Sequence, residues 1–145
     1  MQKKYSLPPF EKLNEDFGVE KAAEAETDFP IREIRKIISE KAYSYLRLVE
    51  TFMNPANAPM SIMSVAKSFG VEERGKLGEI YKKLVKSEFH LISVDIEFSE
   101  KKEAEFIKNI FKTWQEIKKD FLEIVDSAEK NDGNRAEANN RRYFG

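Results

Sequence analysis

The spacing of apolar residues along the chain predicts a succession of amphipathic helices. In the segment 29–53, charged residues fall between apolar positions that recur every three or four residues. These positions are Ile31, Ile34, Ile38, Ala42, Tyr45, Val49 and Phe52. Such spacing places one face of an α-helix against a core. Asp28 is suited to cap this helix, with Pro30 in its first turn, and Asn54-Pro55 is expected to end it.

Two further helices are expected in the segment 60–96. A short apolar helix from Met60 to Phe69 should be closed by Gly70 in a left-handed conformation. The next helix should begin near Glu72, because acidic residues favour the positive end of a helix. Its apolar positions are Leu77, Ile80, Tyr81, Leu84, Val85, Phe89 and Ile92. The alternation over 92–98 also fits a strand, but we expect helix followed by a turn, since no second strand is available to pair.

The longest helix is predicted over 100–129, with Ser99 as its cap. Its apolar seam alternates spacings of three and four and comprises Ile107, Ile110, Trp114, Ile117, Phe121, Ile124 and Ala128. Adjoining apolar residues widen the stripe to roughly 160° at 100° per residue. A stripe of this width is expected to need cover from two sides.

Both ends of the chain are expected to be less regular. Residues 6–17 should form a short helix that Gly18 stops, and residues 19–26 another. From Asn131 the sequence shows no hydrophobic periodicity, so a polar tail is expected there.

The elements together predict an all-α fold, a helical bundle of three long amphipathic helices with one short connecting helix and short N-terminal helical pieces. The chain is accordingly divided into an N-terminal extension over 1–28, a helical bundle domain over 29–130 and a polar C-terminal tail over 131–145. No internal repeat is present.

Composition narrows the classes of protein to consider. The chain has 145 residues, which suits one domain, and 41% of them are hydrophobic. Cysteine is absent, which excludes disulfides and thiolate ligands and fits a cytoplasmic location. Neither a secretory signal in residues 1–9 nor a membrane-spanning run is predicted. Charged residues make up 35% and nearly balance to −1, a composition also typical of proteins from heat-loving organisms.

The stretch Gly70-Val-Glu-Glu-Arg-Gly75-Lys76-Leu77 comes within one residue of a phosphate-binding P-loop. In that motif, glycine N–H groups and a lysine bind phosphates while a Ser or Thr hydroxyl holds magnesium. Here Leu77 replaces the hydroxyl residue, two glutamates would oppose the phosphates, and a helix precedes the motif where a strand is needed. We therefore expect no nucleotide site and predict no cofactor.

The same region also resembles a degenerate helix-turn-helix over residues 60–86. Val65, Ala66, Phe69, Gly70 and Val71 are suitable types at suitable offsets, whereas the next apolar positions lie one residue late. Lysines on the second helix would contact phosphates in this interpretation, namely Lys76, Lys82, Lys83 and Lys86. Aromatic and basic residues near the C-terminus, including Arg141 and Tyr143, would add to such a surface. Nucleic-acid binding is therefore the alternative hypothesis, although the acidic residues Glu72 and Glu73 disfavour it.

Other chemistry finds little support in the sequence. His90 is the single histidine, and Ser87 and Ser93 occupy the positions where a carboxylate-bridged metal bundle needs glutamate. No nucleophile motif accompanies it, so His90 is expected to be an ordinary helical residue, and no catalytic or metal site is predicted. Arg35 and Lys118 fall inside apolar stripes. Their stems are expected to cover apolar surface with the charge in water, the alternatives being a cation–π contact or an intersubunit ion pair.

These observations predict a non-enzymatic, cytoplasmic helical protein that self-associates as a homodimer, or with another helical protein, and acts as an interaction or adaptor module. The predicted interface consists of Ile107, Ile110, Trp114, Ile117 and Phe121. The alternative is that the same side chains form an intramolecular core. On the interface hypothesis, Trp114→Glu should give a soluble monomer or no folded protein.

Overall fold

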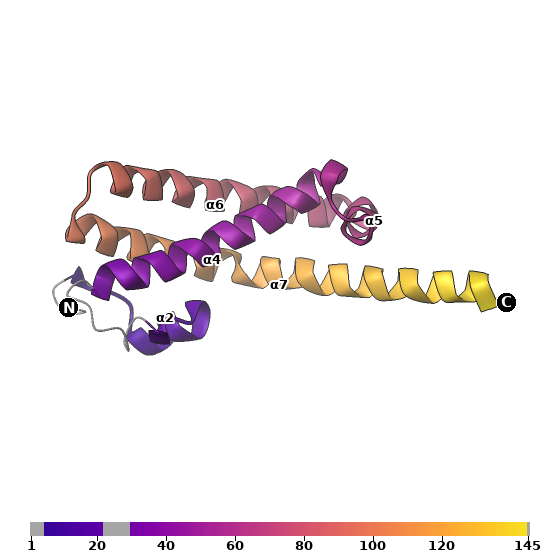
Figure 1. Ribbon diagram of the computed structural model, residues 1–145, viewed down its shortest axis with the longest axis horizontal. Coiled ribbons are helices and arrows are strands. Elements are labelled where there is room, and N and C mark those ends of the chain that lie inside the picture. Colours follow the sequence, from indigo (N-terminus) through magenta and orange to yellow (C-terminus); the bar gives the residue numbers. More distant parts are fainter. Residues whose placement is uncertain (1–4, 22–29, 145) are drawn as a thin grey trace. The chain divides into compact units, whose positions relative to one another are not determined.

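The computed structural model describes residues 5–21 and 30–144, and in these ranges the chain is helical and contains no strand (Figure 1). The elements in chain order are α2 (Phe10–Phe17), α4 (Pro30–Met53), the short 3₁₀ helix η1 (Pro55–Asn57), α5 (Met60–Ser68), α6 (Val71–Ile96) and α7 (Glu100–Phe144). The predicted all-α class is therefore confirmed. Within the same ranges, no helix combines the length and the apolar character needed to cross a membrane.

The N-terminal helix α2 ends where the sequence predicts. Gly18 follows it with φ of 64°, the left-handed region that glycine adopts without a Cβ penalty, and its N–H bonds to the Asn14 carbonyl. The Asn14 side chain also accepts a hydrogen bond of 3.0 Å from the backbone N–H of Glu20. Most of the helix predicted over 19–26, and the proposed cap Asp28, lie outside the described residues.

The connection between α5 and α6 differs from the prediction. Phe69 leaves α5 in extended geometry, and Gly70 does not take a positive φ, so the left-handed cap expected there is wrong. Gly70 instead precedes α6: its carbonyl accepts a bond from the Arg74 N–H, and its own N–H donates to the Glu73 carboxylate at 3.0 Å. Glu73 thus provides one half of a capping box, which starts α6 without a left-handed residue.

The ends of the two longest helices test two other expectations. Because α6 continues to Ile96, the strand alternative for 92–98 is wrong and the expected helix and turn are confirmed. Ser99 caps α7 as predicted, its hydroxyl accepting a bond from the Lys102 N–H. The predicted end at residue 129 is wrong, since α7 runs to Phe144: adding residues to an existing helix is far easier than starting one. The division into segments 1–28, 29–130 and 131–145 stays a prediction.

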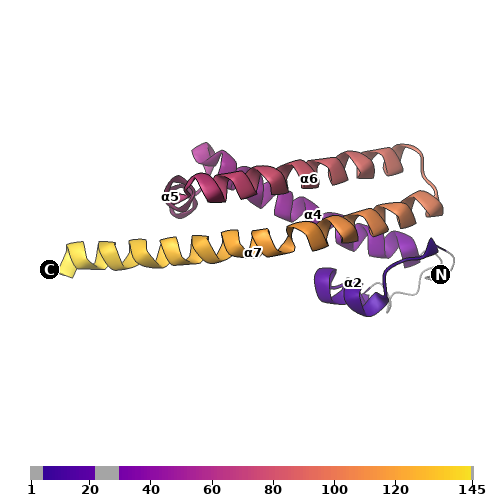
Figure 2. The ribbon, with the colours of Figure 1, turned by 180° about the vertical axis from the view of Figure 1, so that it is seen from behind.

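The contacts divide the chain into two compact units, and each of the three long helices contributes to both. Unit 1 consists of Met1–Leu46 and Lys83–Glu116, and unit 2 consists of Arg47–Lys82 and Ile117–Gly145. In unit 1 both views place the beginning of α4 beside the turn between α6 and α7 (Figures 1 and 2).

Each unit has its own buried apolar residues. In unit 1 they are Leu13, Phe17, Val19, Ile31, Ile38, Ala42, Leu46, Leu84, Leu91, Val94, Ala104, Phe106, Ile107, Ile110 and Trp114. In unit 2 they are Val49, Phe52, Val65, Ala66, Phe69, Leu77, Ile80, Ile117, Phe121 and Ile124. The unit 2 core contains an edge-to-face pair of Phe52 and Phe69, with ring centroids 5.3 Å apart. In unit 2, the Asn131 side chain of α7 also donates a hydrogen bond of 2.7 Å to the Ser68 hydroxyl of α5.

Candidate interaction surface

The five residues predicted to form an interface are buried by the chain itself. Ile107, Ile110 and Trp114 belong to the core of unit 1, and Ile117 and Phe121 to that of unit 2. This arrangement is the alternative stated for them, an intramolecular core. Self-association itself stays a prediction, but these side chains do not present a surface to a partner.

Trp114 shows how completely the chain fills this seam. Its ring stacks on Tyr45 of α4, with centroids 5.1 Å apart and planes 11° from parallel. Phe17 of α2 packs at 6.0 Å, and Gln115 next to Trp114 donates a hydrogen bond to Asp16. The second side that the wide stripe of α7 requires is therefore supplied in unit 1 by α2.

A run of exposed apolar side chains in unit 1 lies on α6. Four residues spaced 4-3-4 follow one another along the helix, and we call them the outer stripe: Val85, Phe89, Ile92 and Ile96. Phe89 is 68% exposed, Ile92 48% and Ile96 78%, while Val85 is partly buried. At 100° per residue the four fall within an arc of about 60°. The stripe is a narrow apolar seam that the described residues leave largely exposed at Phe89, Ile92 and Ile96.

The inner face of α6 lies on the opposite side of the helix. Leu84, Leu91 and Val94 are buried there and point into the unit 1 core. Phe89 and Ile92 were predicted to join this face, but at 100° per residue Phe89 lies nearly half a turn from it and Ile92 about a third of a turn. The helix is apolar on both faces, which a soluble surface helix ordinarily is not.

Charged residues border the outer stripe with opposite sign on its two sides. Lys86 follows one edge, and Glu88 and Asp95 follow the other. Glu88 is half-buried, and this burial raises the pKa of its carboxyl, with the charge of Asp95 as the smaller cause. Asp95 in turn lies 3.8 Å from the Arg35 guanidinium.

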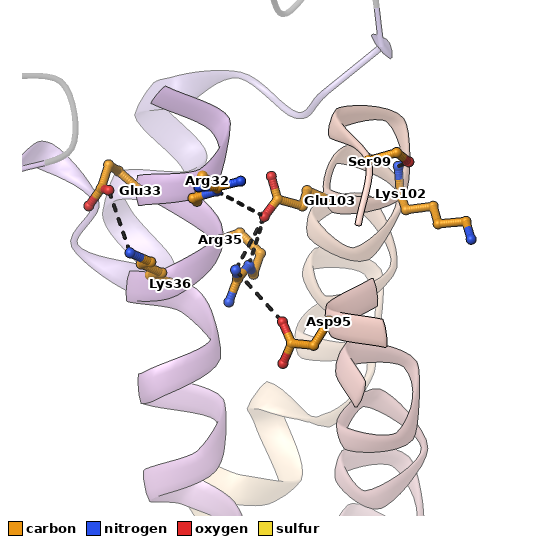
Figure 3. A network of polar contacts seen from close by, with 8 residues as sticks. All are labelled: Arg32, Glu33, Arg35, Lys36, Asp95, Ser99, Lys102 and Glu103. Atoms are coloured by element: carbon orange, nitrogen blue, oxygen red, sulfur yellow. Dashed lines mark hydrogen bonds and ion pairs between the residues drawn. The ribbon is translucent and has the colours of Figure 1, made fainter. Parts of the chain in front are cut away.

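Arg35 belongs to a buried ion cluster between α4, α6 and α7 in unit 1 (Figure 3). Its Nε and Nη2 both donate to Oε1 of Glu103 on α7, each at 3.2 Å, and the Glu103 residue is only 1% exposed. Arg32 Nε lies 3.9 Å from the same oxygen, and the Arg32 guanidinium lies 4.0 Å above the Phe98 ring. Arg35 therefore forms an ion pair within the unit, and the expectation that its charge reaches water is wrong.

The burial of Glu103 could have been predicted from its position in the sequence, but its charge argued against a place in the core. Glu103 stands four residues before Ile107 and seven before Ile110, so it occupies the next position of the apolar seam of α7. Arg35 likewise lies within the apolar stripe of α4. A cation and an anion, each on an inward face of a different helix, are the pair that burial requires, because an unpaired buried charge is costly. Lys118, by contrast, is exposed, as expected of a cation whose stem covers apolar surface.

The P-loop interpretation does not fit the backbone in unit 2. Gly75 and Lys76 lie within α6, and the Gly70 N–H already bonds to Glu73, so no loop is present to surround a phosphate. Lys76 instead contacts Glu72 at 3.4 Å and bonds to Glu123 of α7. This hydrogen bond is the main cause that raises the pKa of Lys76 and lowers the pKa of Glu123.

The helix-turn-helix interpretation also lacks its expected packing. Val71, which should be buried after the turn, is 90% exposed, and the second helix is anchored by Leu77 and Ile80 instead. Like Lys76, two of the other lysines that this interpretation assigned to phosphates lie close to carboxylates. Lys82 lies 3.4 Å from Glu79, and Lys83 lies 3.4 Å from Glu116. Lys86 has no ion pair with the described side chains of residues 5–21 and 31–131.

His90 lies beside α7 in unit 1. Its ring packs edge-on against Phe106 at 5.7 Å, and its Nδ1 lies 3.5 Å from the Asn109 side-chain nitrogen. These contacts orient the ring toward a polar groove between α6 and α7, lined in part by Lys83, Lys86 and Lys112.

No protein-family model, curated protein or solved structure matched the chain. Two surfaces of unit 1 are candidates for a functional role: the outer stripe of α6 and the polar groove beside His90.

Proposed function

We propose that this protein is a non-enzymatic helical interaction module that self-associates, with the outer stripe of α6 covered by the same stripe of a second copy. The observation that carries the proposal is the run of exposed apolar side chains at Phe89, Ile92 and Ile96. A helix that is apolar on its outer face is stabilised by a partner that removes this face from water. The lack of cysteine supports a cytoplasmic location for the assembly.

The geometry of the stripe supports a helical partner. The 4-3-4 spacing is that of alternating seam positions in a two-stranded coiled coil, which an identical seam covers by inserting knobs into holes. Because packing of Leu84, Leu91 and Val94 already holds α6 as a helix, association would not have to order it. Two heptads are few, so we expect a weak, concentration-dependent dimer.

The charges beside the stripe support a parallel arrangement of the two copies. In a parallel two-fold pair, opposite edges of the two seams face each other. The edge with Lys86 would then face the partner's edge with Glu88 and Asp95. An antiparallel pair would bring acidic edges together, and like charges across an interface are unfavourable.

Sedimentation velocity over a wide concentration range tests the proposal. The wild-type chain should shift from monomer to dimer as concentration rises, and the double substitution Phe89→Glu with Ile96→Glu should keep it monomeric. Both positions are exposed, so the variant should retain the helical circular dichroism signal and melting temperature of the wild type. Leu122→Glu is the matched control, because it places a charge on an apolar side chain that is 53% exposed but off the stripe.

A single introduced cysteine tests the orientation, since the natural chain has none. Ile96→Cys should form an intermolecular disulfide under oxidising conditions if the seams are parallel, because identical positions then lie face to face. A wild-type chain that stays monomeric at every concentration, or a double glutamate variant that still dimerises, would refute the proposal. A dimer without the disulfide would refute only the parallel arrangement.

The alternative of a nucleic-acid-binding regulator stays a prediction and has less support. Three of its four assigned lysines lie close to glutamates, and the exposed Val71 is not packed as a recognition helix needs. Salt-dependent binding to mixed duplex DNA, weakened by Lys82→Glu and Lys83→Glu, would favour it.

A further inference from the structure

A polar groove in unit 1 runs between α6 and α7 and has a volume of about 520 Å³. The α6 side contributes Lys83, Lys86, Ser87 and His90, and the α7 side contributes Asn109, Lys112, Thr113 and Glu116. The groove lies beyond the edge of the outer stripe and has a different chemical character, since no apolar residue lines it.

The charges that line the groove are predominantly positive. Three lysines, Lys83, Lys86 and Lys112, face one carboxylate, Glu116, which gives a net charge of +2 with His90 neutral. Glu116 is 3.4 Å from Lys83, so these two offset each other. Lys86 and Lys112 have no ion-pair partner within the described part of the chain. This local excess contrasts with the whole chain, whose formal charge is −1.

His90 adds an oriented donor to these cations. Phe106 packs against its ring, and the Asn109 amide lies 3.5 Å from Nδ1. A neutral ring that accepts this weak hydrogen bond at Nδ1 carries its proton on Nε2. In that tautomer the Nε2–H is the ring donor that a ligand held by the lysines would accept from.

We infer that this groove binds a small molecule bearing a diphosphate group. Lysine ammonium groups bind phosphate as point charges, and two phosphates are needed to use cations spread over two helices. A volume of about 520 Å³ exceeds what a single phosphate fills and leaves room for an organic group. A long nucleic acid is disfavoured, because Glu116 lies in the groove and Glu88 lies on the same helix as Lys86.

The single histidine provides a direct test. In a ¹³C-labelled sample the ring Cε1–Hε1 signal of His90 is unique, and it should shift saturably as inorganic pyrophosphate is added. Lys112→Glu should weaken this binding by roughly tenfold or more, the effect expected from losing a charged hydrogen bond and adding a like charge. Lys112 is exposed, so the variant should melt as the wild type does.

Lys101→Glu on the same helix is the matched control, because it makes the same charge change at an exposed position about 16 Å along α7 at 1.5 Å per residue. Its affinity for pyrophosphate should stay within about twofold of the wild type, and so should that of Ile96→Glu alone, which places a charge in the outer stripe about 15 Å along α6 from Lys86 at 1.5 Å per residue. The latter result separates this site from the proposed dimer.

Three outcomes would overturn the inference. One is a shift that rises without saturation and matches sodium chloride at equal ionic strength. Another is unchanged affinity in Lys112→Glu. The third is tighter binding of a single-stranded thymidine hexamer than of pyrophosphate, which would assign the groove to nucleic acid.

Discussion

The guanidinium of Arg35 on α4 and the carboxylate of Glu103 on α7 form a buried ion pair in which two nitrogens of Arg35 donate to one oxygen of Glu103. The Arg35 side chain is 12% exposed and that of Glu103 2%. Asp95 of α6 adds a second anion at 3.8 Å from the same guanidinium. With Asp95, the pair joins α4, α6 and α7 within unit 1, which has a direct consequence for stability.

Glu103→Gln should destabilise the protein by about 3 kcal/mol, because it leaves buried guanidinium charge without its main counterion. Chemical denaturation followed by circular dichroism measures this difference. Glu105→Gln is the control, since it removes the same charge from an exposed position two residues away. The double substitution Arg35→Met with Glu103→Leu should recover most of the loss. A Glu103→Gln variant as stable as Glu105→Gln would contradict this view of the pair.

Two glycines should respond differently to alanine. Gly18→Ala should destabilise the protein by about 1 kcal/mol, because φ of 64° places its Cβ in a strained conformation. Gly70→Ala should change stability little, since the nearest atom to its Cβ is the flexible end of Glu73 at 3.0 Å. Thermal melting of the two variants side by side checks the prediction. If Gly70→Ala instead lost more stability than Gly18→Ala, the result would support the left-handed conformation that the sequence predicted for Gly70.

Two carboxyls of α6 and its C-terminal turn should give pH effects of opposite sign. Burial raises the pKa of Glu88 above its ordinary 4.5, so the folded state binds more protons than the unfolded chain between 4.5 and that higher value. Stability attributable to Glu88 therefore falls as pH rises through this window. Glu88→Gln should stabilise the protein at neutral pH, by about 0.5 kcal/mol, and this gain should vanish below pH 4.5.

Glu97 provides the comparison of opposite sign. Its hydrogen bond from Lys102 lowers the pKa of its carboxyl below 4.5, so the stability it contributes is present above pH 4.5 and is lost as pH falls through the lowered pKa. Glu97→Gln should therefore destabilise at neutral pH, with the difference vanishing in acid. Melting temperatures of both variants from acid to neutral pH measure the two effects. Parallel curves for the two variants would refute the assignment.

The helix class and the helix boundaries that depend on local backbone chemistry were predictable from the sequence. Pro30, Asn54 and Ser99 act locally on the backbone, and the bounds of α4 and the start of α7 follow from them. The prediction of a left-handed cap at Gly70 was wrong because the Glu73 carboxylate, three residues later, accepts a hydrogen bond from the Gly70 N–H and so caps the start of α6. The end of α7 was missed because helix propagation needs no hydrophobic periodicity.

The candidate surfaces were harder to predict, for reasons that concern tertiary packing. Periodicity shows that α6 is apolar at Leu84 and at Phe89, but not which of the two faces inward, because that depends on the helices beside it. The seam of α7 looked wide enough to need a second copy, whereas Phe17 from a separate short helix covers Trp114. The polar groove joins residues about 26 positions apart, such as Lys86 and Lys112, and no local pattern links them.

The position of Trp114 also makes the protein a convenient spectroscopic subject. It is the single tryptophan of the chain, and it is buried in unit 1 against Tyr45 and Phe17. Its fluorescence emission therefore reports the loss of packing in unit 1, whereas the far-ultraviolet signal reports helices from both units. Unfolding curves of the unlabelled wild-type protein, recorded by tryptophan fluorescence and by far-ultraviolet circular dichroism, therefore distinguish concerted melting of the two units from sequential melting.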